Sequence, residues 1–433
     1  MTTFTLAFWI YLIVFIGFLA LGAPIYMSLL CSGMAYVFIH GRIDQMAVMA
    51  KMYGSLDSFV LLAIPMFMAA GIIMNVGGIT DRIFGFCVKL IGHFPGGLAY
   101  VNVLASFIFS GMSGSALADV GGLGNIEIKA MRDEGYDDAS IFGITAASAT
   151  MGPIVPPSIP FVIYGSAASV SVGTLFMAGV GPGITIGIIL CIAIYFIAKK
   201  NHWHVHKRAT GREVWGSFKH ALLALLMPVI IMGGIMSGYF TPTEASCIAV
   251  TYSTIIVIFI YRDMPLQNLP HAIGETVDGI VPALAIVSSA SLFGWVLQFE
   301  HIGTKMLHAM LSVTHDKWLI LLMIDIILLF MGMILDSTPT IMMMVPIFQP
   351  LVREVGISEI QLGVVTVLNL MIGLMSPPYG QSLFMLSGTT RTPFNDVVKY
   401  VVPWLIPMLI ALAAVTFIPD ISLAIPRALG FAV

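Results

Sequence analysis

Charged side chains are scarce in this sequence. They make up 9% of the 433 residues, whereas 58% of the residues are hydrophobic. A soluble protein of this length needs far more charge to cover its surface, so a water-soluble globular fold is excluded and a lipid bilayer is the expected solvent. The net charge of −3 is too small to favour nucleic acid as a partner. The composition therefore predicts an integral membrane protein in contact with lipid.

Cysteines are few, and no nucleotide-binding motif is present. Gly121-Gly-Leu-Gly124 lacks the Gly-Lys-Ser/Thr ending of a phosphate-binding loop, which argues against an ATP-driven pump. No small-residue cleavage site with a polar exit follows the apolar stretch from Phe4 to Ala20, so we expect a retained helix rather than a signal peptide. The cysteines show no metal-ligand spacing and are interpreted as packing residues: Cys31, Cys87, Cys191 and Cys247.

Long apolar stretches dominate the rest of the sequence. Those long enough to cross a bilayer lie near 4–22, 24–40, 56–80, 139–168, 171–198, 221–239, 242–261, 276–299, 360–390 and 400–425. Two further regions, 96–130 and 318–352, are interrupted by Ser110-Gly-Met-Ser-Gly-Ser115 and Asp336-Ser-Thr-Pro-Thr340. Their arms of about 15–18 residues predict two re-entrant hairpins with polar tips. The expected fold is an all-α membrane protein of about ten spanning helices plus these hairpins.

Two proline pairs, Pro156–Pro157 and Pro377–Pro378, interrupt two of the spans. Proline has no N–H, so it cannot donate to the carbonyl group four residues earlier. The carbonyls released in this way are those of Gly152, Pro153, Gly373 and Leu374. At membrane depth such groups must be buried in protein or line a hydrated site. A break in each half of the chain therefore indicates binding of ions and substrate between internal repeats.

The two halves share one order of elements in opposite orientations. The basic segment 199–219 is placed in the cytoplasm, so the hairpin 96–130 enters from inside and the hairpin 318–352 from outside. In both halves the hairpin is followed by a broken helix and a closing helix. Ser113 and Pro156 are 43 residues apart, and Ser337 and Pro377 are 40 apart. This near-equal spacing predicts an inverted repeat.

The repeat divides the chain into four parts. Residues 1–55 are expected to form scaffold helices. Residues 56–198 are the first transport-domain repeat, with the hairpin 96–130 and the broken helix 139–168. Residues 199–275 form a cytoplasmic connector and further scaffold helices. Residues 276–433 are the second repeat, with the hairpin 318–352 and the broken helix 360–390.

Hydroxyls and freed carbonyls gather at the tips and breaks of both halves. A buried site for sodium, a hard cation, needs several oxygen ligands without much net charge. The first predicted sodium site is formed by Ser113, Ser115, Gly152, Val155 and Pro157. The repeat predicts a second sodium site from Ser337, Thr338, Gly373, Ser376 and Pro378. The alternative is that these small residues only allow helices to approach closely.

Two carboxylates, Asp119 and Asp336, lie near the tips. A carboxylate at membrane depth is costly and usually functional, so we predict that both contribute to a substrate site together with Ser115 and Thr338. Each also has a structural alternative. Asp119 suits the positive N-terminal end of the second hairpin arm. Asp336 suits the cap of an arm that starts at Thr338.

Polar residues after the second break complete the predicted substrate site. Half-helices that restart at Ser158 and Tyr379 offer N-terminal dipoles to an anionic substrate. Tyr379 and Gln381 are predicted to donate hydrogen bonds to it, and an interhelical amide bond is the alternative for Gln381. Asp325, in the middle of a hairpin arm, has no assigned role. The triplet His202, His204 and His206 is interpreted as part of a solvated loop rather than a metal site.

Motifs along the whole chain resemble those of the large membrane subunit of tripartite ATP-independent periplasmic (TRAP) transporters, within the ion-transporter superfamily. The most specific are Ser113-Gly-Ser-Ala-Leu-Ala-Asp119 and Gly152-Pro-Ile-Val-Pro-Pro-Ser158. The others are Gly22-Ala-Pro-Ile25, Ala63-Ile-Pro-Met-Phe67, Leu335-Asp336, Val345-Pro-Ile-Phe348 and Pro377-Pro378.

The resemblance implies a transport subunit rather than an enzyme, in a bacterial inner membrane and without an organic cofactor. It implies sodium-coupled uptake of a carboxylated solute delivered by a periplasmic binding protein, through an elevator movement of the hairpin-bearing domain. It also implies a small membrane subunit of about four helices. Because nothing precedes Met1, we expect that subunit to be a separate chain. Overall likeness favours sialic acid, with C4-dicarboxylates and other acidic sugars next.

Three other functions remain open on the sequence alone. A passive channel is disfavoured, because channels rarely need two opposed re-entrant hairpins with paired breaks. Proton coupling through Asp119 or Asp336 is the nearer alternative. An intramembrane serine hydrolase that uses Ser113 or Ser115 is more remote, because such a nucleophile needs a base within hydrogen-bond reach, and the histidines all fall in or beside predicted loops.

Overall fold

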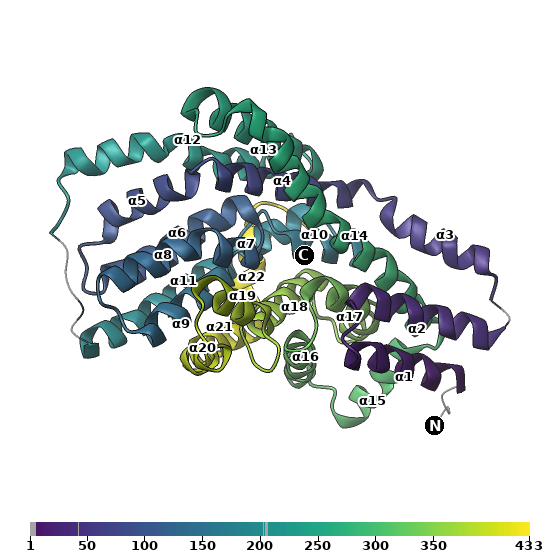
Figure 1. Cartoon of the computed structure of the whole chain (residues 1–433). Helices are drawn as coiled ribbons and strands as arrows, with labels where there is room; N and C mark the ends of the chain where they lie inside the picture. Colours follow the sequence, from purple (N-terminus) through teal and green to yellow (C-terminus); the bar gives the residue numbers. More distant parts are fainter. Residues whose placement is uncertain (1–5, 42, 202, 204–206) are drawn as a thin grey trace.

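The computed structural model describes residues 6–41, 43–201, 203 and 207–433, so His202, His204 and His206 lie outside the described residues. Throughout this part of the chain the regular structure is helical, which confirms the all-α prediction. Six helical segments are long and apolar enough to cross a membrane, and five shorter apolar helices accompany them. Figure 1 shows these helices packed side by side in an elongated molecule.

The first half of the chain starts with α1 (Leu6–Ala20), α2 (Ile25–His40), α3 (Gln45–Leu56), the 3₁₀ helix η1 (Phe59–Leu62), α4 (Ala63–Val76) and α5 (Ile79–Ile91). The predicted first hairpin is α6 (Gly97–Ser113), α7 (Ala116–Gly121) and α8 (Leu123–Asp133). The broken helix is α9 (Asp138–Ala149) and α10 (Ile159–Ala168), and the closing helix is α11 (Val172–Asn201). The second arm of the hairpin is interrupted at Gly122, which the sequence analysis did not anticipate.

The second half repeats this order. It starts with α12 (Gly211–Met236), α13 (Pro242–Ile255), the π-helix η2 (Ile256–Tyr261), the 3₁₀ helix η3 (Leu266–Asn268), α14 (Leu269–Phe299) and α15 (Ile302–Val313). The hairpin is α16 (Lys317–Gly332) and α17 (Ser337–Glu354), and the broken helix is α18 (Glu359–Leu374) and α19 (Gln381–Thr390). The chain closes with α20 (Phe394–Val401), the 3₁₀ helix η4 (Val402–Trp404), α21 (Leu405–Phe417) and α22 (Asp420–Ala428).

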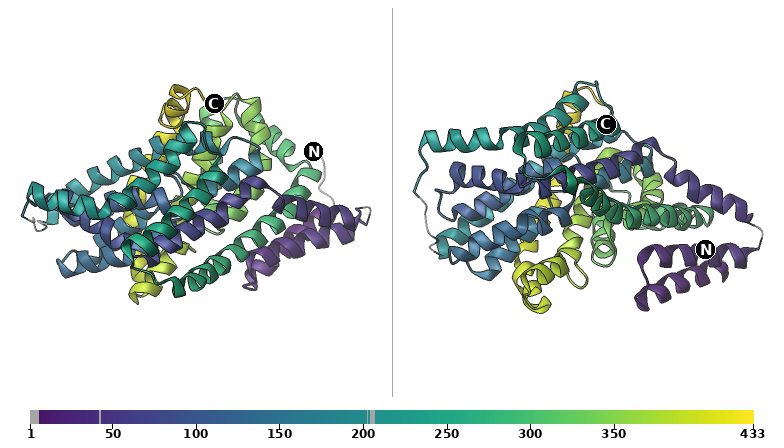
Figure 2. Two further views of the ribbon diagram at one scale, coloured as in Figure 1. Left: turned by 90° about the horizontal axis from the view of Figure 1, so that it is seen from above. Right: turned by 45° about the horizontal axis from the view of Figure 1, so that its top comes forward.

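The packing between the two halves is reciprocal: where a helix of one half contacts a helix of the other, the counterparts of these two helices also contact each other. Helix α2 packs against α14, and its counterpart α13 packs against α4. In the same way α7 packs against α19, and α17 packs against α10. The helix pair α1–α2 and the helix α12 lie at opposite ends of the molecule (Figures 1 and 2). Each half therefore completes its packing with elements of the other half, as expected for two related repeats.

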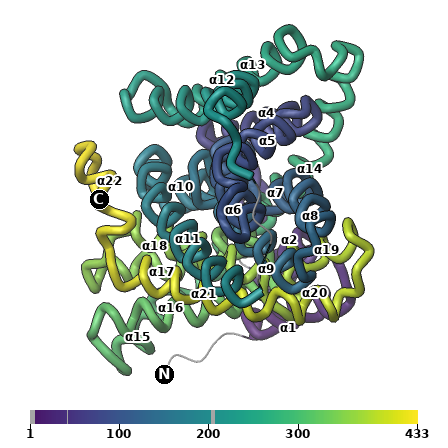
Figure 3. Tube along the Cα trace, turned by 90° about the vertical axis from the view of Figure 1, so that its left-hand side faces the viewer, coloured from purple at the N-terminus to yellow at the C-terminus, as the bar shows by residue number. Residues whose placement is uncertain are grey.

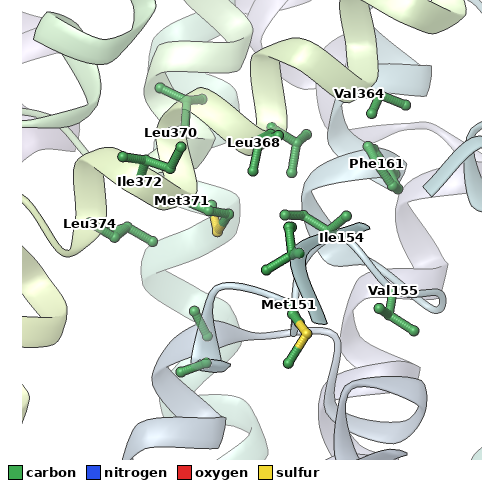
Figure 4. Packing of buried hydrophobic residues seen from close by; sticks show 14 of the residues in the cluster. Met151, Ile154, Val155, Phe161, Val364, Leu368, Leu370, Met371, Ile372 and Leu374 are labelled. Atoms are coloured by element: carbon green, nitrogen blue, oxygen red, sulfur yellow. The ribbon is translucent and has the colours of Figure 1, made fainter. Parts of the chain in front are cut away.

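The hairpins and broken helices form the interior. Figure 3 shows α6 at the centre of the first repeat, and α6 contacts α4, α5, α8, α9, α11 and α12. Across the middle of the molecule, Ile154 of the first break faces Leu368 and Met371 of α18, whereas Met151 points away from them towards Gly187 of α11 (Figure 4). All four side chains are buried. This apolar contact holds the two broken helices at a set position relative to each other.

The exterior is apolar where lipid is expected. Ile184, Ile188 and Ile192 follow one face of α11 at intervals of four residues, and all three are exposed. A residue four positions further along a helix returns to the same face, so these side chains form one stripe. Among the cysteines, which are all free, Cys87 is buried and Cys247 is exposed, so the packing role predicted for them fits Cys87 and not Cys247.

Candidate functional site

The tip of the first hairpin is a sharp reversal between two helices. Helix α6 ends at Ser113, and Gly114 follows in the left-handed region at φ 61°, which glycine adopts without steric cost. Ser115 then caps α7, and its Oγ atom accepts a hydrogen bond of 3.4 Å from the Ala118 N–H. Ser115 is therefore held by the helix that it starts. Asp119 lies in the first turn of α7, as its structural alternative predicted.

The first break lies against this tip. The Ile159 N–H donates to the Gly114 carbonyl at 3.4 Å, which joins the restart of the broken helix to the tip. A side chain on Gly152 would begin 3.1 Å from the backbone carbonyl of Ser115, so the two backbones are in close contact. Ser158 caps α10, with its Oγ atom accepting from the Phe161 N–H at 3.2 Å.

Oxygen atoms without hydrogen-bond donors remain where the break meets the tip. Within the described part of the chain, no hydrogen bond ends on the carbonyls of Gly152, Val155 or Pro157. The hydroxyl of Ser113 is also buried and has no partner there. The carbonyl of Pro153, by contrast, accepts a hydrogen bond from the Ser158 hydroxyl. Carbonyl and hydroxyl oxygens are the kind of ligand that a sodium ion uses, and the sodium site formed by these residues remains a prediction.

The tip of the second hairpin is capped by a carboxylate. Oδ1 of Asp336 accepts from the Ser337 N–H at 2.7 Å, so α17 starts at Ser337 and not at Thr338 as the capping alternative assumed. The hydroxyl of Thr340 donates to the Asp336 carbonyl at 2.8 Å and secures the first turn. Ser337 and Thr338 are buried beside this cap.

The second break satisfies more of its own oxygens than the first. The Gly373 carbonyl, predicted to be released, accepts from the Ser376 N–H at 2.9 Å. The Ser376 hydroxyl donates to the Ile372 carbonyl at 2.7 Å. Pro378 is exposed, and both proline pairs contain a cis peptide bond. Gly373 lies directly on the backbone of Gly332, at the end of the first arm of the second hairpin. The oxygens of the second predicted sodium site are thus partly occupied by local bonds.

The two tips meet at one cavity of about 240 Å³. Gly114, Ser115, Ala116 and Leu117 of the first tip line it, and so do Asp336, Ser337 and Thr338 of the second. Pro153, Ile159 and Pro160 of the first broken helix and Met371 and Leu374 of the second complete this side. No basic side chain is present in its described lining. The cavity combines hydroxyl groups and one carboxylate with an apolar wall.

Three predicted substrate-binding residues do not line this cavity. Asp119 is only 1% exposed, and neither of its carboxylate oxygens has a hydrogen-bond partner among the described residues. Tyr379 is exposed and packs against Phe384, with 5.3 Å between the ring centroids. Gln381 is the first residue of α19, beyond the second break. Their roles in substrate binding remain predictions.

The opposite wall of the cavity was missed by the sequence analysis. Helix α4 contributes Ile64 and Met68, and α14 contributes Gly279, Pro282, Ala283 and Ile286. Two sequence signals point to these helices, because each carries a proline in an apolar stretch, at Pro65 and Pro282. Neither signal identifies the side chains that face the cavity. These lining residues belong to the predicted repeats 56–198 and 276–433 and not to the predicted scaffold segments 1–55 and 199–275, so the cavity lies between the hairpins and the first helices of the two repeats.

A larger groove is present elsewhere but carries little chemistry. Its volume is about 990 Å³, and it is lined by apolar residues of α6 and α11 such as Val103, Phe107 and Ile188. It lies on the outer side of α11 and includes neither hairpin tip. In a membrane such a surface is covered by lipid chains, so the smaller cavity is the candidate solute site.

The chain matches known membrane transport proteins over most of its length. The family described as "Tripartite ATP-independent periplasmic transporter, DctM component" matches residues 12–421. The sialic acid TRAP transporter large permease protein SiaM of Vibrio cholerae is 40% identical over 412 residues, which are 95% of this chain and 96% of that protein. The sialic acid TRAP transporter permease protein SiaT of Haemophilus influenzae is 40% identical over 97% of this chain and 68% of its own length.

Relatives with other substrates are also similar. The C4-dicarboxylate TRAP transporter large permease protein DctM of Pseudomonas aeruginosa is 38% identical over 93% of this chain and 94% of that protein. Among solved structures, the YdaH transporter of Alcanivorax borkumensis superposes with a TM-score of 0.62, covering 85% of this chain and 86% of its own. Its sequence identity is 12%, so this likeness concerns the fold alone.

Proposed function

The chain belongs to the family of DctM components, the large permease subunits of TRAP transporters, and we propose that it couples sodium entry to the import of a carboxylated solute. It is a multi-pass protein of a bacterial inner membrane and a transport subunit rather than an enzyme. The observation that carries the proposal is the meeting of both hairpin tips at one cavity, next to oxygens that accept no hydrogen bond from any described residue.

The cavity suits a small anion that also carries hydroxyl groups. Its 240 Å³ lies below the range of about 300–1,000 Å³ that is common for drug-sized ligands. The first turns of α10 and α17 line it, and the positive ends of both helices favour a carboxylate. When Asp336 is ionised, it accepts hydrogen bonds and donates none, so it complements hydroxyl donors on the solute. This pairing favours sialic acid, which has more hydroxyl groups than a C4-dicarboxylate, whereas the small volume of the cavity favours the C4-dicarboxylate.

Sodium ions are proposed to bind on the inner side of the two tips. Ser113, Gly152, Val155 and Pro157 supply the first set of oxygens, together with Ser115. In the second set, Ser337, Thr338 and Pro378 join Gly373 and Ser376. Binding at these sites would stabilise the tips in the arrangement that forms the cavity, because the ion and the solute share the tip residues. This sharing supplies a physical basis for coupling.

The position of the cavity between two groups of helices supports a proposal for how the solute crosses the membrane. One wall comes from the hairpins and broken helices and the other from α4 and α14. We propose an elevator movement in which the hairpin-bearing helices slide along α4 and α14 and carry the solute across the membrane. A small membrane subunit, here proposed to be a separate chain, and a periplasmic binding protein would complete the system.

Uptake into proteoliposomes tests the proposed coupling. The chain is reconstituted with its small membrane subunit, and sialic acid is supplied on the binding protein with an inward sodium gradient. We expect uptake to stop when potassium replaces sodium at constant pH. Uptake that continues unchanged in potassium would exclude sodium coupling and favour proton coupling. A C4-dicarboxylate and a diketo sugar acid, each on a suitable binding protein, test the substrate in the same assay.

A further inference from the structure

A carboxyl group lies inside the second hairpin, away from the cavity and from both predicted sodium sites. Asp325 is in the middle of α16, and 5% of it is exposed. Its Oδ1 atom accepts a hydrogen bond of 2.7 Å from Nδ2 of Asn369 on α18. None of the ion pairs formed by described residues includes it. Burial without a cationic partner disfavours the ionised form of a carboxyl group.

The helices around Asp325 bring no compensating charge. Helix α16 packs against α17, α18 and α21, and α21 has no ionisable side chain. The ionisable groups of the other neighbours lie at or near helix ends: Asp336, Arg353, Glu354 and Glu359. On α16 itself, Lys317 lies two turns away, about 12 Å along the helix axis. Thr416 of α21 faces the carboxyl group, and its hydroxyl is an uncharged hydrogen-bond donor.

The first repeat has a neutral amide at the equivalent place. Asn102 of α6 and Ser148 of α9 are linked by a hydrogen bond of 2.6 Å from the Ser148 hydroxyl to Oδ1 of Asn102. Ser148 and Asn369 each precede the first proline of their pair by eight residues. Asn102 and Asp325 precede it by 54 and 52 residues. The same contact between a hairpin arm and a broken helix therefore recurs, with an amide in one repeat and a carboxyl group in the other.

The unpaired amide oxygen of Asn369 indicates that the Asp325 carboxyl group is protonated. Nδ2 of Asn369 donates both to Asp325 and, at 2.9 Å, to the Val365 carbonyl, which sets the orientation of the amide. Its Oδ1 atom is consequently the acceptor, and it is buried without a partner in the described structure. A neutral carboxylic acid has both an acceptor and an O–H donor, so it can form two complementary hydrogen bonds with an amide. An ionised carboxylate cannot supply that donor.

We propose that Asp325 is a proton-binding site within the second repeat. One proton from water adds to the carboxylate and forms the neutral acid, whose O–H donates to Oδ1 of Asn369 while its other oxygen accepts from Nδ2. When the pH rises, the proton returns to water, and the carboxylate then faces the unpaired Asn369 oxygen. The contact between α16 and α18 weakens as a result. Transport should therefore decline at alkaline pH without any change at the sodium sites.

Infrared spectroscopy of the purified protein tests the site directly. Asp325→Asn keeps both hydrogen bonds to Asn369, because its amide also has one acceptor and one donor group. Subtracting the spectrum of this variant from that of the unmodified protein near neutral pH should leave the carbonyl band of one neutral carboxylic acid. The matched control is Asp57→Asn, which removes an exposed carboxyl group and should leave carboxylate bands instead. Carboxylate bands in the Asp325 difference spectrum would overturn the proposal.

Uptake measured at different pH values tests the predicted decline of transport at alkaline pH. Only this second test rests on the proposed transport function. At a saturating sodium gradient, we expect uptake by the unmodified protein to fall with rising pH, at most about tenfold per pH unit because one proton is lost. Asp325→Asn should fold, transport and show a much flatter profile. Identical profiles in the two proteins would contradict the proposal. A neutral-acid band in a protein that fails to transport sialic acid would contradict the proposed function instead.

Discussion

Each hairpin tip has a hydroxyl group and a carboxyl group, one at the helix cap and one four residues later, but the order of the two groups is reversed between the tips. In the first tip Ser115 caps the second arm, and Asp119 follows four residues later. In the second tip Asp336 is the cap, and Thr340 follows four residues later. Both caps line the cavity, whereas Asp119 and Thr340 are buried behind them. The exchange places one carboxylate at the cavity and the other away from it.

A repeated backbone therefore need not give a symmetrical site. The first tip presents the Ser113 hydroxyl and its break presents three carbonyls, none of which has a hydrogen-bond partner among the described residues, and such oxygens suit a cation. The second tip presents a carboxylate, and its break has already engaged Gly373 and Ser376 in local bonds. We therefore expect substitutions in the first repeat to change the dependence on sodium and those in the second to change the solute and the fold.

The largest effect is expected from Asp336→Ser, which gives the second tip the capping residue of the first. Serine and aspartate cap helices about equally well, so the fold should persist. Losing a charged hydrogen bond of about 1.5–3 kcal/mol should lower uptake by about 10- to 100-fold. The measurement is the initial rate of uptake at low solute concentration. Unimpaired uptake by a well-folded Asp336→Ser protein would remove Asp336 from the substrate site.

A second prediction compares the glycines at the two breaks. A side chain on Gly373 would begin 2.6 Å from the Cα atom of Gly332, whereas the nearest backbone atoms to one on Gly152 are 3.1 Å away. Gly373→Ala should therefore lower stability more than Gly152→Ala does, with overpacking that costs about 1–3 kcal/mol. Thermal unfolding of the two variants in detergent measures the difference. Equal unfolding temperatures would show that the second break is no more tightly packed than the first.

A smaller effect is expected from Ser113→Ala. The Ser113 hydroxyl has no partner in the described part of the chain, so its removal should leave stability unchanged. The sodium concentration for half-maximal uptake should rise, because one ligand of the first proposed sodium site is lost. The control is Ser376→Ala at the second proposed sodium site: its hydroxyl already donates to the Ile372 carbonyl, so we expect a smaller sodium shift than for Ser113→Ala. A larger sodium shift in the control than in Ser113→Ala would reverse the roles assigned to the two repeats.

The smallest effects are expected after the second break. Tyr379 and Gln381 lie outside the cavity, so Tyr379→Phe and Gln381→Ala should leave the apparent affinity for the solute close to that of the unmodified protein. Solute competition for uptake measures it. A marked loss of affinity in either variant would support the original prediction from the sequence and would require a transport state in which α19 reaches the solute.

Local signals explain why the breaks and tips could be predicted from the sequence. Proline lacks an N–H wherever it lies, and both proline pairs do interrupt helices, between α9 and α10 and between α18 and α19. Serine and glycine at Ser113–Ser115 likewise end one helix and start another. Thr241 caps α13 for the same reason, and Glu244 at the third position of that helix completes the capping box.

The rest depended on contacts between residues far apart in the chain. Hydrophobicity, proline and caps act within a few residues, so they were enough to predict a lipid-embedded helical repeat with two polar tips. The fold was needed to show that Asp336 and not Asp119 lines the cavity, that α4 and α14 supply its other wall, and that Asp325 meets Asn369. Which side of a helix is buried, and against what, depends on how the two repeats pack together.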